Sequence, residues 1–170
     1  RNLSLQWLSD CFEQLIIEDL TNGENPIRVH MEHPIQEYLP GMLRLSNQNK
    51  EIKMQIRELA ISDRTSMMEY KITNLSQQRK KLQCFLTGTA TYSDAQCHTV
   101  NEQTLSVNVN EGKHSFVVLF PEKSQLILES SKSYKTSLPT IELRKGASYT
   151  FYTYTTYTPG ENVQSALEKH

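Results

Sequence analysis

The sequence predicts a mainly β protein: an antiparallel, immunoglobulin-like β-sandwich that forms a single domain over residues 1–170. Apolar and polar residues alternate along most of the segment 24–158, which is the period of a half-buried strand. Turns rich in Gly, Pro and Asn separate these runs, and no helices alternate with them, which favours a sandwich over a parallel sheet. The composition, 37% apolar and 22% charged, suits a globular domain with its own core.

Residues 1–23 are the exception, and we expect them to form an amphipathic helix packed on the sandwich. Their apolar residues recur at helical spacing on one stripe. This stripe consists of Leu5, Leu8, Phe12, Leu15 and Ile16. Ser4 is a suitable N-cap and Gly23 a suitable stop. Glu18 and Asp19 would lie in the last turn, where the helix dipole disfavours anions, so packing must hold the helix.

The predicted strands follow in chain order after this helix. Their runs are Ile27–Met31, Met42–Leu45, Ile52–Ile61, Met68–Thr73, Leu82–Tyr92, Leu105–Val109, His114–Phe120, Leu126–Leu128, Thr140–Leu143 and Ser148–Tyr157. The alternation slips by one position near Arg57-Glu58, which a β-bulge would explain, with a short helix as the alternative. Pro34 is predicted to end the first run, and residues 159–170 to form a short helix or a tail.

The sequence carries no signature of catalysis or of cofactor binding. It lacks the glycine-rich phosphate loops, the G-x-S-x-G elbow and the H-E-x-x-H pair. A net charge of -1 provides no field that would attract a nucleic acid or an anionic membrane. The longest apolar run, Phe116–Phe120, is far shorter than the ~20 residues of a spanning helix. We therefore predict no enzyme activity, no catalytic residues, no cofactor, no nucleic-acid partner and no membrane span.

Two weak metal candidates do not change this prediction. His30 and Glu32 share one face of a predicted strand, but His33 faces the other way, so three ligands would not converge. Cys97 and His98 are adjacent in a polar loop and lack the ligand spacing of a closed zinc site. We accordingly predict no metal ligands.

The cysteines are expected to have a structural role, and the basic residues are expected to lie in solvent. Cys11, Cys84 and Cys97 are odd in number and lack C-x-x-C spacing, so reduced thiols are favoured, although a bridge between Cys84 and Cys97 stays open. The one basic run, Arg79-Lys80-Lys81, is predicted to be a solvated loop tip, because no aromatic residues are interleaved to stack bases. The sequons at Asn2 and Asn74 are attributed to chance.

The segment Ser148–Tyr157 carries aromatic and β-branched residues on both faces of one predicted strand. Tyr149 and Phe151 share one face, and Tyr152 and Tyr154 share the other. The first pair is expected to be core, because Phe has no hydroxyl to satisfy. The second pair is either ordinary sheet surface or a recognition face, since Tyr combines a large apolar area with a hydroxyl. Tyr152, Tyr154 and Tyr157 are the candidate partner-binding residues.

Between Met68 and Glu122 the order of features resembles the MSP/PapD-like sandwiches, in particular the ASH-type domains of centrosomal and ciliary proteins. The segments that carry the resemblance are Tyr70–Ser76, Leu82–Leu86, Val107–Gly112 and Phe116–Pro121. They cover about a third of the chain, and the front helix and the Tyr/Thr strand depart from the pattern. The resemblance implies a PapD-like, non-catalytic domain that binds proteins or peptides, often along sheet edges, at the centrosome or cytoskeleton.

From these observations we expect a protein–protein interaction module, a scaffold or adaptor, from a larger intracellular protein. Its protein partner would bind an exposed strand edge or the Tyr face, and other domains of the parent protein would contact it. The alternative is the accessory β-sandwich of a multidomain enzyme whose catalytic residues lie outside this chain. Carbohydrate or lipid binding is disfavoured, because the lone Trp7 falls on the helix. The chain opens at Arg1 with neither Met nor a signal peptide, which predicts an excised fragment of a longer protein, and a cytoplasmic location is expected for this module.

Overall fold

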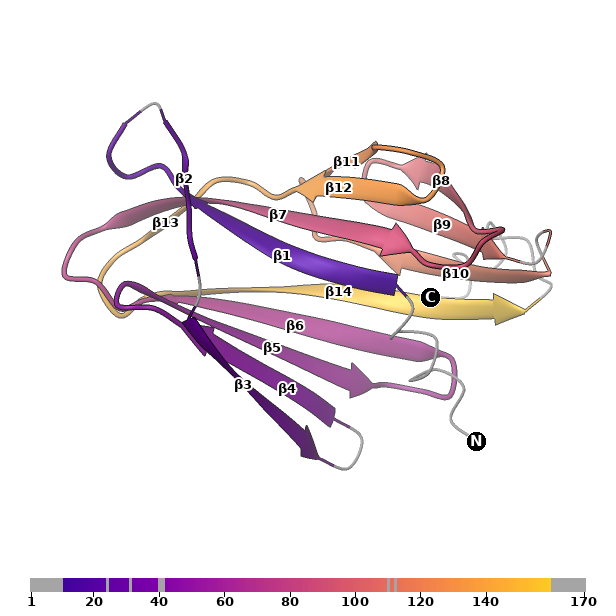
Figure 1. Ribbon diagram of the computed structural model, residues 1–170, viewed down its shortest axis with the longest axis horizontal. Helices are drawn as coiled ribbons and strands as arrows, with labels where there is room; N and C mark the ends of the chain where they lie inside the picture. Colours follow the sequence, from indigo (N-terminus) through magenta and orange to yellow (C-terminus); the bar gives the residue numbers. More distant parts are fainter. Residues whose placement is uncertain are drawn as a thin grey trace.

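Two facing antiparallel β-sheets make up the protein in the computed structural model (Figure 1). The model describes residues 11–23, 25–30, 32–39, 42–109, 111 and 113–159, and this part of the chain contains strands but no helix. Buried residues of both sheets form one hydrophobic core. The prediction of a mainly β sandwich is therefore confirmed.

The smaller sheet has six strands in the order β11-β12-β7-β1-β2, with β13 also paired to β7. Its strands are β1 (Cys11–Asp19), β2 (Ile27–Arg28), β7 (Lys80–Ala90), β11 (Gln125–Leu128), β12 (Ser133–Ser137) and β13 (Ile141–Leu143). The larger sheet has eight strands in the order β3-β4-β5-β6-β14-β10-β9-β8. Its strands are β3 (Glu32–Leu39), β4 (Met42–Gln48), β5 (Ile52–Ala60), β6 (Thr65–Asn74), β8 (Gln96–Asn101), β9 (Thr104–Val109), β10 (His114–Leu119) and β14 (Ser148–Pro159).

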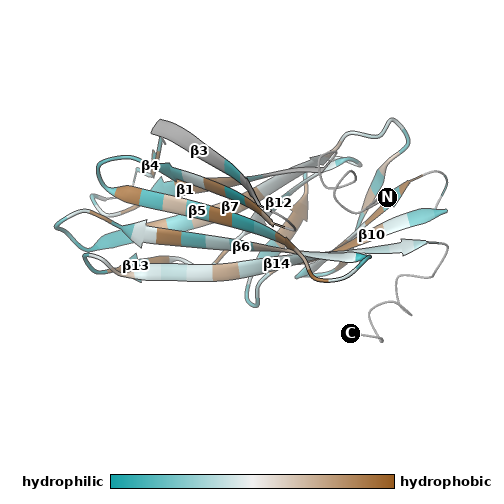
Figure 2. Ribbon diagram, turned by 90° about the horizontal axis from the view of Figure 1, so that it is seen from below, coloured by the Kyte–Doolittle hydropathy of each residue, from teal (hydrophilic) through white to brown (hydrophobic). Residues whose placement is uncertain are grey.

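The core lies between the sheets and is filled by alternate residues of the facing strands, and brown and teal bands alternate along several of these strands in Figure 2. Tyr70 of β6 is fully buried and stacks on Phe151 of β14, with 4.8 Å between ring centroids. Leu82 and Leu86 of β7 enter from the smaller sheet. Because side chains alternate across a strand, the period-two runs in the sequence place these residues on the core side.

The predicted front helix is wrong for residues 11–19, which form strand β1. This strand pairs antiparallel with β7 along its whole length, from Cys11 opposite Ala90 to Asp19 opposite Leu82. Ile17 is buried in the core, and Leu15 packs against it. A long hydrogen-bonded partner outweighs the helical spacing of the apolar residues, and the β-branched Ile16 and Ile17 also favour a strand.

The remaining helix predictions fall outside the described residues. Residues 1–10, with Leu5 and Leu8 of the predicted stripe, are not described, and neither is the predicted short terminal helix from residue 160 onward. Strand β14 continues to Pro159, one residue beyond the predicted end of the sheet at residue 158.

The predicted β-bulge at Arg57-Glu58 is also wrong. Strands β5 and β6 pair without a register shift from Ile52 opposite Asn74 to Ala60 opposite Ser66. The slip in the apolar pattern arises because Glu58 occupies an inward-facing position, in phase with the buried Ile52.

A register shift does occur in β3, where its pairing with β4 moves between Glu32 and Ile35. Pro34 therefore lies inside a strand rather than ending one. Strand β3 is at the edge of the larger sheet, where a residue without an N–H donor is tolerated.

Asn74, at the end of β6, organises the turn into β7. Its side-chain amide is fully buried and donates to the carbonyls of Gln78 (2.8 Å) and Leu143 (2.9 Å). Its side-chain oxygen accepts from the backbone N–H and the hydroxyl of Ser76. The sequon at Asn74 is thus enclosed in the folded protein, in agreement with its assignment to chance.

Candidate functional site

The outer face of the larger sheet presents two of the three candidate tyrosines. Tyr152 and Tyr154 are 40% and 36% exposed, whereas Phe151 between the sheets is 3% exposed. The predicted orientation of strand β14 is therefore confirmed. Whether the two tyrosines bind a partner stays a prediction.

Tyr157 lies on the opposite face and is not part of this group. It is half-buried, and its hydroxyl lies 2.7 Å from Nδ1 of His114. Its ring contacts the buried Phe116, with 5.4 Å between centroids. Tyr157 lies an odd number of positions along the strand from both Tyr152 and Tyr154, so strand alternation turns it toward the core.

Charged residues lie beside the two tyrosines on the same outer face. The strand register places Arg44, Arg57 and Glu69 in one row across β4, β5 and β6, and this row ends at Tyr152 on β14. Arg57 donates through Nε to Oε1 of Glu69 at 2.8 Å, so its guanidinium is paired with the carboxylate that lies between it and Tyr152 in this row. Sequence reasoning missed this row, because it depends on pairing between strands that are distant in the chain.

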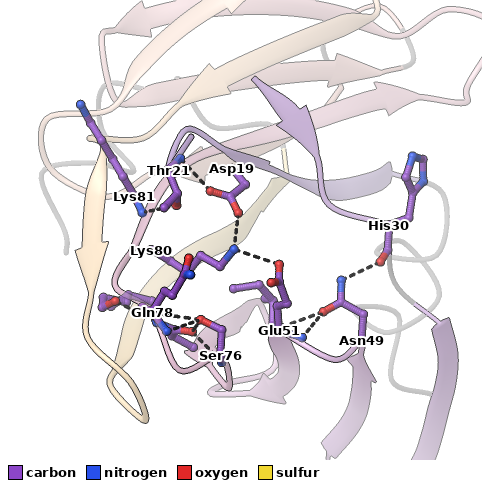
Figure 3. A network of polar contacts seen from close by, with 12 residues as sticks. Asp19, Thr21, His30, Asn49, Glu51, Ser76, Gln78, Lys80 and Lys81 are labelled. Carbon is purple, nitrogen blue, oxygen red and sulfur yellow. Dashed lines mark hydrogen bonds and ion pairs between the residues drawn. The ribbon is translucent and has the colours of Figure 1, made fainter. Parts of the chain in front are cut away.

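A second polar cluster joins the two sheets at the end where β6 turns into β7 (Figure 3). The ammonium group of Lys80, the first residue of β7, donates to Oδ2 of Asp19 at 2.7 Å and to Oε2 of Glu51 at 2.9 Å. Asp19 ends β1, and Glu51 lies in the turn between β4 and β5 of the other sheet. We call these three residues the lysine clasp.

Burial and pairing act in opposite directions on the two buried members of the clasp. Burial alone would raise the pKa of Asp19, but hydrogen bonds from Lys80 and Thr21 outweigh it and leave that pKa lowered. Burial alone would lower the pKa of Lys80, but hydrogen bonds to Asp19 and Glu51 outweigh it and leave that pKa raised. Both groups therefore stay charged at neutral pH, and Lys80 is unsuited to act as a base or nucleophile.

The clasp corrects the prediction that Arg79-Lys80-Lys81 is wholly a solvated loop tip. The Lys80 side chain is only 4% exposed. Arg79 and Lys81 are exposed, and Arg79 forms an ion pair with Glu142. The sequence shows three equivalent cations, and only the tertiary contacts separate the buried one from its neighbours.

Glu58 is an acidic group on the inner face of the larger sheet. Its Oε1 atom is enclosed and accepts no hydrogen bond, and burial raises the pKa of this carboxyl. The hydroxyl oxygen of Ser66 is likewise enclosed without a partner. Ser66 and Glu58 occupy nearby positions on paired strands β6 and β5. The slip in the apolar alternation at Glu58 was the one sequence signal of this group.

The two cysteines whose side chains the structure describes are buried and unpaired. Cys84 and Cys97 are free, so the bridge left open by the sequence does not form. Burial raises the pKa of the Cys84 thiol to about 12, and it also raises the pKa of Cys97. Both thiols are thus protonated at neutral pH and poorly reactive.

The metal candidates are not brought together where the structure describes them. Cys97 is buried and His98 is exposed, on opposite sides of β8. The described residues contain no group of three or more His, Cys, Asp or Glu that could hold a metal ion. The side chains of Glu32 and His33 lie outside the description. In the part of the chain that the structure describes, no helix has the length and apolar character needed to cross a bilayer.

Comparison with known proteins finds similarity in solved structures alone. No family model matches the sequence, and neither does any curated protein. A polysaccharide lyase shares 15% identity and a TM-score of 0.62 over 91% of this chain. A putative kojibiose phosphorylase from the human microbiome shares 12% identity and a TM-score of 0.55 over 90% of it. A heparan sulfate lyase from Pedobacter heparinus shares 9% identity and a TM-score of 0.52 over 81% of it.

At these identities the similarity establishes the fold alone. The chain spans 27%, 23% and 23% of the lengths of these three proteins, so it corresponds to about a quarter of each. All three are named as enzymes that act on saccharides, and none is an MSP/PapD-like scaffold domain. The β-sandwich of this chain therefore resembles one section of larger carbohydrate-active enzymes.

Proposed function

We propose that this chain is an accessory β-sandwich domain of a larger carbohydrate-active enzyme whose catalytic residues lie outside it. The observation that carries the proposal is the match to the polysaccharide lyase, which includes 91% of this chain but 27% of the lyase. Nearly the whole sandwich is therefore shared, whereas most of the lyase has no counterpart here.

Two further observations support an accessory role. The similar structures include both lyases and a phosphorylase, which catalyse different reactions, so the sandwich is compatible with more than one kind of chemistry. In addition, two potentially nucleophilic groups described in this chain are held in unreactive states. Lys80 is charged and paired, and the Cys84 thiol stays protonated.

The scaffold or adaptor role is a second proposal, together with the finer immunoglobulin-like or PapD-like assignment. The observation in its favour is the exposure of Tyr152 and Tyr154, because tyrosine is enriched in protein–protein interfaces. The same exposure suits an accessory domain that contacts a saccharide. The two proposals differ in what the parent protein does, so an activity assay separates them.

The test compares three proteins: the complete gene product, the same product without residues 11–159, and this chain alone. Each is assayed for depolymerisation of uronate-containing and sulfated polysaccharides and for phosphorolysis of glucose disaccharides. The accessory role predicts activity in the complete product and none in the isolated chain. It also predicts a lower melting temperature or lower activity when the sandwich is deleted. A complete product that degrades no saccharide and instead copurifies with a protein partner would favour the scaffold role.

A further inference from the structure

We propose that the outer face of the larger sheet binds an anionic polysaccharide, one that carries carboxylate or sulfate groups. The residues of this saccharide-binding face are Tyr152, Tyr154, Arg44, Arg57, Lys53 and Lys71. The inference rests on the proposed function and goes beyond it by naming the class of ligand and the surface that holds it.

The aromatic part of the face is suited to the apolar side of a sugar ring. Tyr152 and Tyr154 are two positions apart on β14, so their side chains stand about 7 Å from each other on the same side. Met67 lies directly opposite Tyr154 on β6 and is half-buried, which widens the apolar surface. Pyranose rings combine an apolar C–H side with a rim of hydroxyls, and tyrosine matches both with its ring and its hydroxyl group.

The basic part of the face provides the charge complementarity. Among the side chains that the structure describes on these strands, the outer side carries four cations, Arg44, Lys53, Arg57 and Lys71, and two carboxylates, Glu37 and Glu69. This face therefore has an excess of positive charge, although the chain as a whole carries a net charge of -1. The separation of charge onto one face favours a negatively charged ligand there.

The pairing of these charges leaves two cations available. Arg57 is held by Glu69, and Arg44 contacts Glu37 at 3.4 Å. Lys53 and Lys71 have no hydrogen bond or ion pair with any described residue. Lys71 lies opposite Thr150 of β14, one position along the strand face from Tyr152, so a ligand on the tyrosines can reach its ammonium group.

The row of residues across the face suits an extended chain. The row from Arg44 through Arg57 and Glu69 to Tyr152 crosses four adjacent strands. Three spacings of about 4.8 Å give it a length of about 14 Å, which is that of a short oligosaccharide. The names of the similar lyases point to the same class, since one acts on a polysaccharide and another on heparan sulfate.

The test measures binding of this chain to heparan sulfate, to a polyuronate and to neutral dextran by isothermal titration calorimetry. Wild-type protein should bind both acidic polymers and not dextran, with an affinity that falls as salt is added. The double variant Tyr152→Ser/Tyr154→Ser should bind at least roughly tenfold more weakly. Lys53→Gln/Lys71→Gln should also weaken binding and should reduce its dependence on salt.

Two control variants match these changes away from the face. Lys81→Gln/Lys145→Gln removes the same charge from exposed positions next to the smaller sheet, and Ile127→Ser removes an exposed apolar side chain from β11. Both should bind as wild type does. Equal binding of dextran and heparan sulfate, equal losses in the control variants, or no binding to either acidic polymer would overturn the inference. Capture of a protein through Tyr152 and Tyr154, without binding to acidic polymers, would overturn it in favour of a protein interface.

The result is separable from the proposed function. A complete gene product that degrades saccharides, combined with a chain that binds no acidic polymer, would refute the saccharide-binding face and leave the accessory role intact. A chain that binds acidic polymers within a gene product that has no activity on saccharides would refute the accessory role and leave the face intact.

Discussion

Replacing Lys80 by Met should destabilise the protein by roughly 2–4 kcal/mol, because the change removes the centre of the lysine clasp. The bond to Asp19 is partly buried and charge-assisted, which corresponds to about 1.5–3 kcal/mol. The bond to Glu51 adds at most about 1 kcal/mol, since that carboxylate is 56% exposed and screened by water. Asp19 retains the backbone N–H of Thr21 at 2.8 Å, so its carboxylate is not left without any donor.

The assay is urea unfolding followed by far-ultraviolet circular dichroism, with Lys81→Met as the matched control. Lys81 is the exposed neighbour of Lys80, and its replacement should change stability by less than about 0.5 kcal/mol. A double-mutant cycle with Asp19→Asn should show a coupling energy of about 1.5 kcal/mol or more. If Lys80→Met unfolds at the same urea concentration as Lys81→Met, the clasp does not hold the sheets together.

The clasp also predicts a dependence of stability on pH. The lowered pKa of Asp19 adds stability that is present above its unfolded value of about 3.9 and is lost as pH falls through the folded pKa. The raised pKa of Lys80 adds stability that is present below its unfolded value of about 10.4 and is lost as pH rises through the folded pKa. The difference between wild type and Lys80→Met should therefore be largest between these values and shrink at both extremes. A difference that is independent of pH would contradict the ionic origin of the effect.

Three further perturbations test other parts of the structure. Gly88→Ala should destabilise by about 1–3 kcal/mol in thermal unfolding, because a Cβ at Gly88 would overlap the buried ring of Tyr134 on the adjacent strand. A melting temperature equal to that of wild type would show that the ring moves freely. Glu58→Gln should stabilise the protein at pH 7, since burial raises the pKa of Glu58. The gain in stability should vanish below about pH 4.3, where the carboxyl is protonated in both folded and unfolded protein. A gain that persists at low pH would exclude ionisation as its cause. Cys84 should resist alkylation by iodoacetamide at pH 8 until the protein is unfolded in urea, because its thiol is buried with a pKa of about 12. Labelling is followed by mass spectrometry. Rapid labelling of the native protein would show that the core opens locally.

The sequence by itself determined the features that depend on strand alternation. Successive side chains of a strand point to opposite faces, so the order of residues in β14 was enough to place Phe151 in the core and to expose Tyr152 and Tyr154. The same rule correctly separates Tyr152 from Tyr149. The rule also places Tyr157 with the inward set, which separates it from the other two candidate partner-binding residues, Tyr152 and Tyr154.

Only the tertiary structure decided the features that depend on pairing between distant segments. Residues 11–19 carry apolar side chains at a helical spacing, but β7, which lies more than 60 residues further along the chain, offers a nine-residue partner and makes them a strand. Lys80 is indistinguishable from Arg79 and Lys81 until Asp19 and Glu51 are brought to it from two other elements. Local spacing decides which way a side chain points along a strand, whereas the partner across the sheet decides whether a segment is a strand at all and which charges are buried.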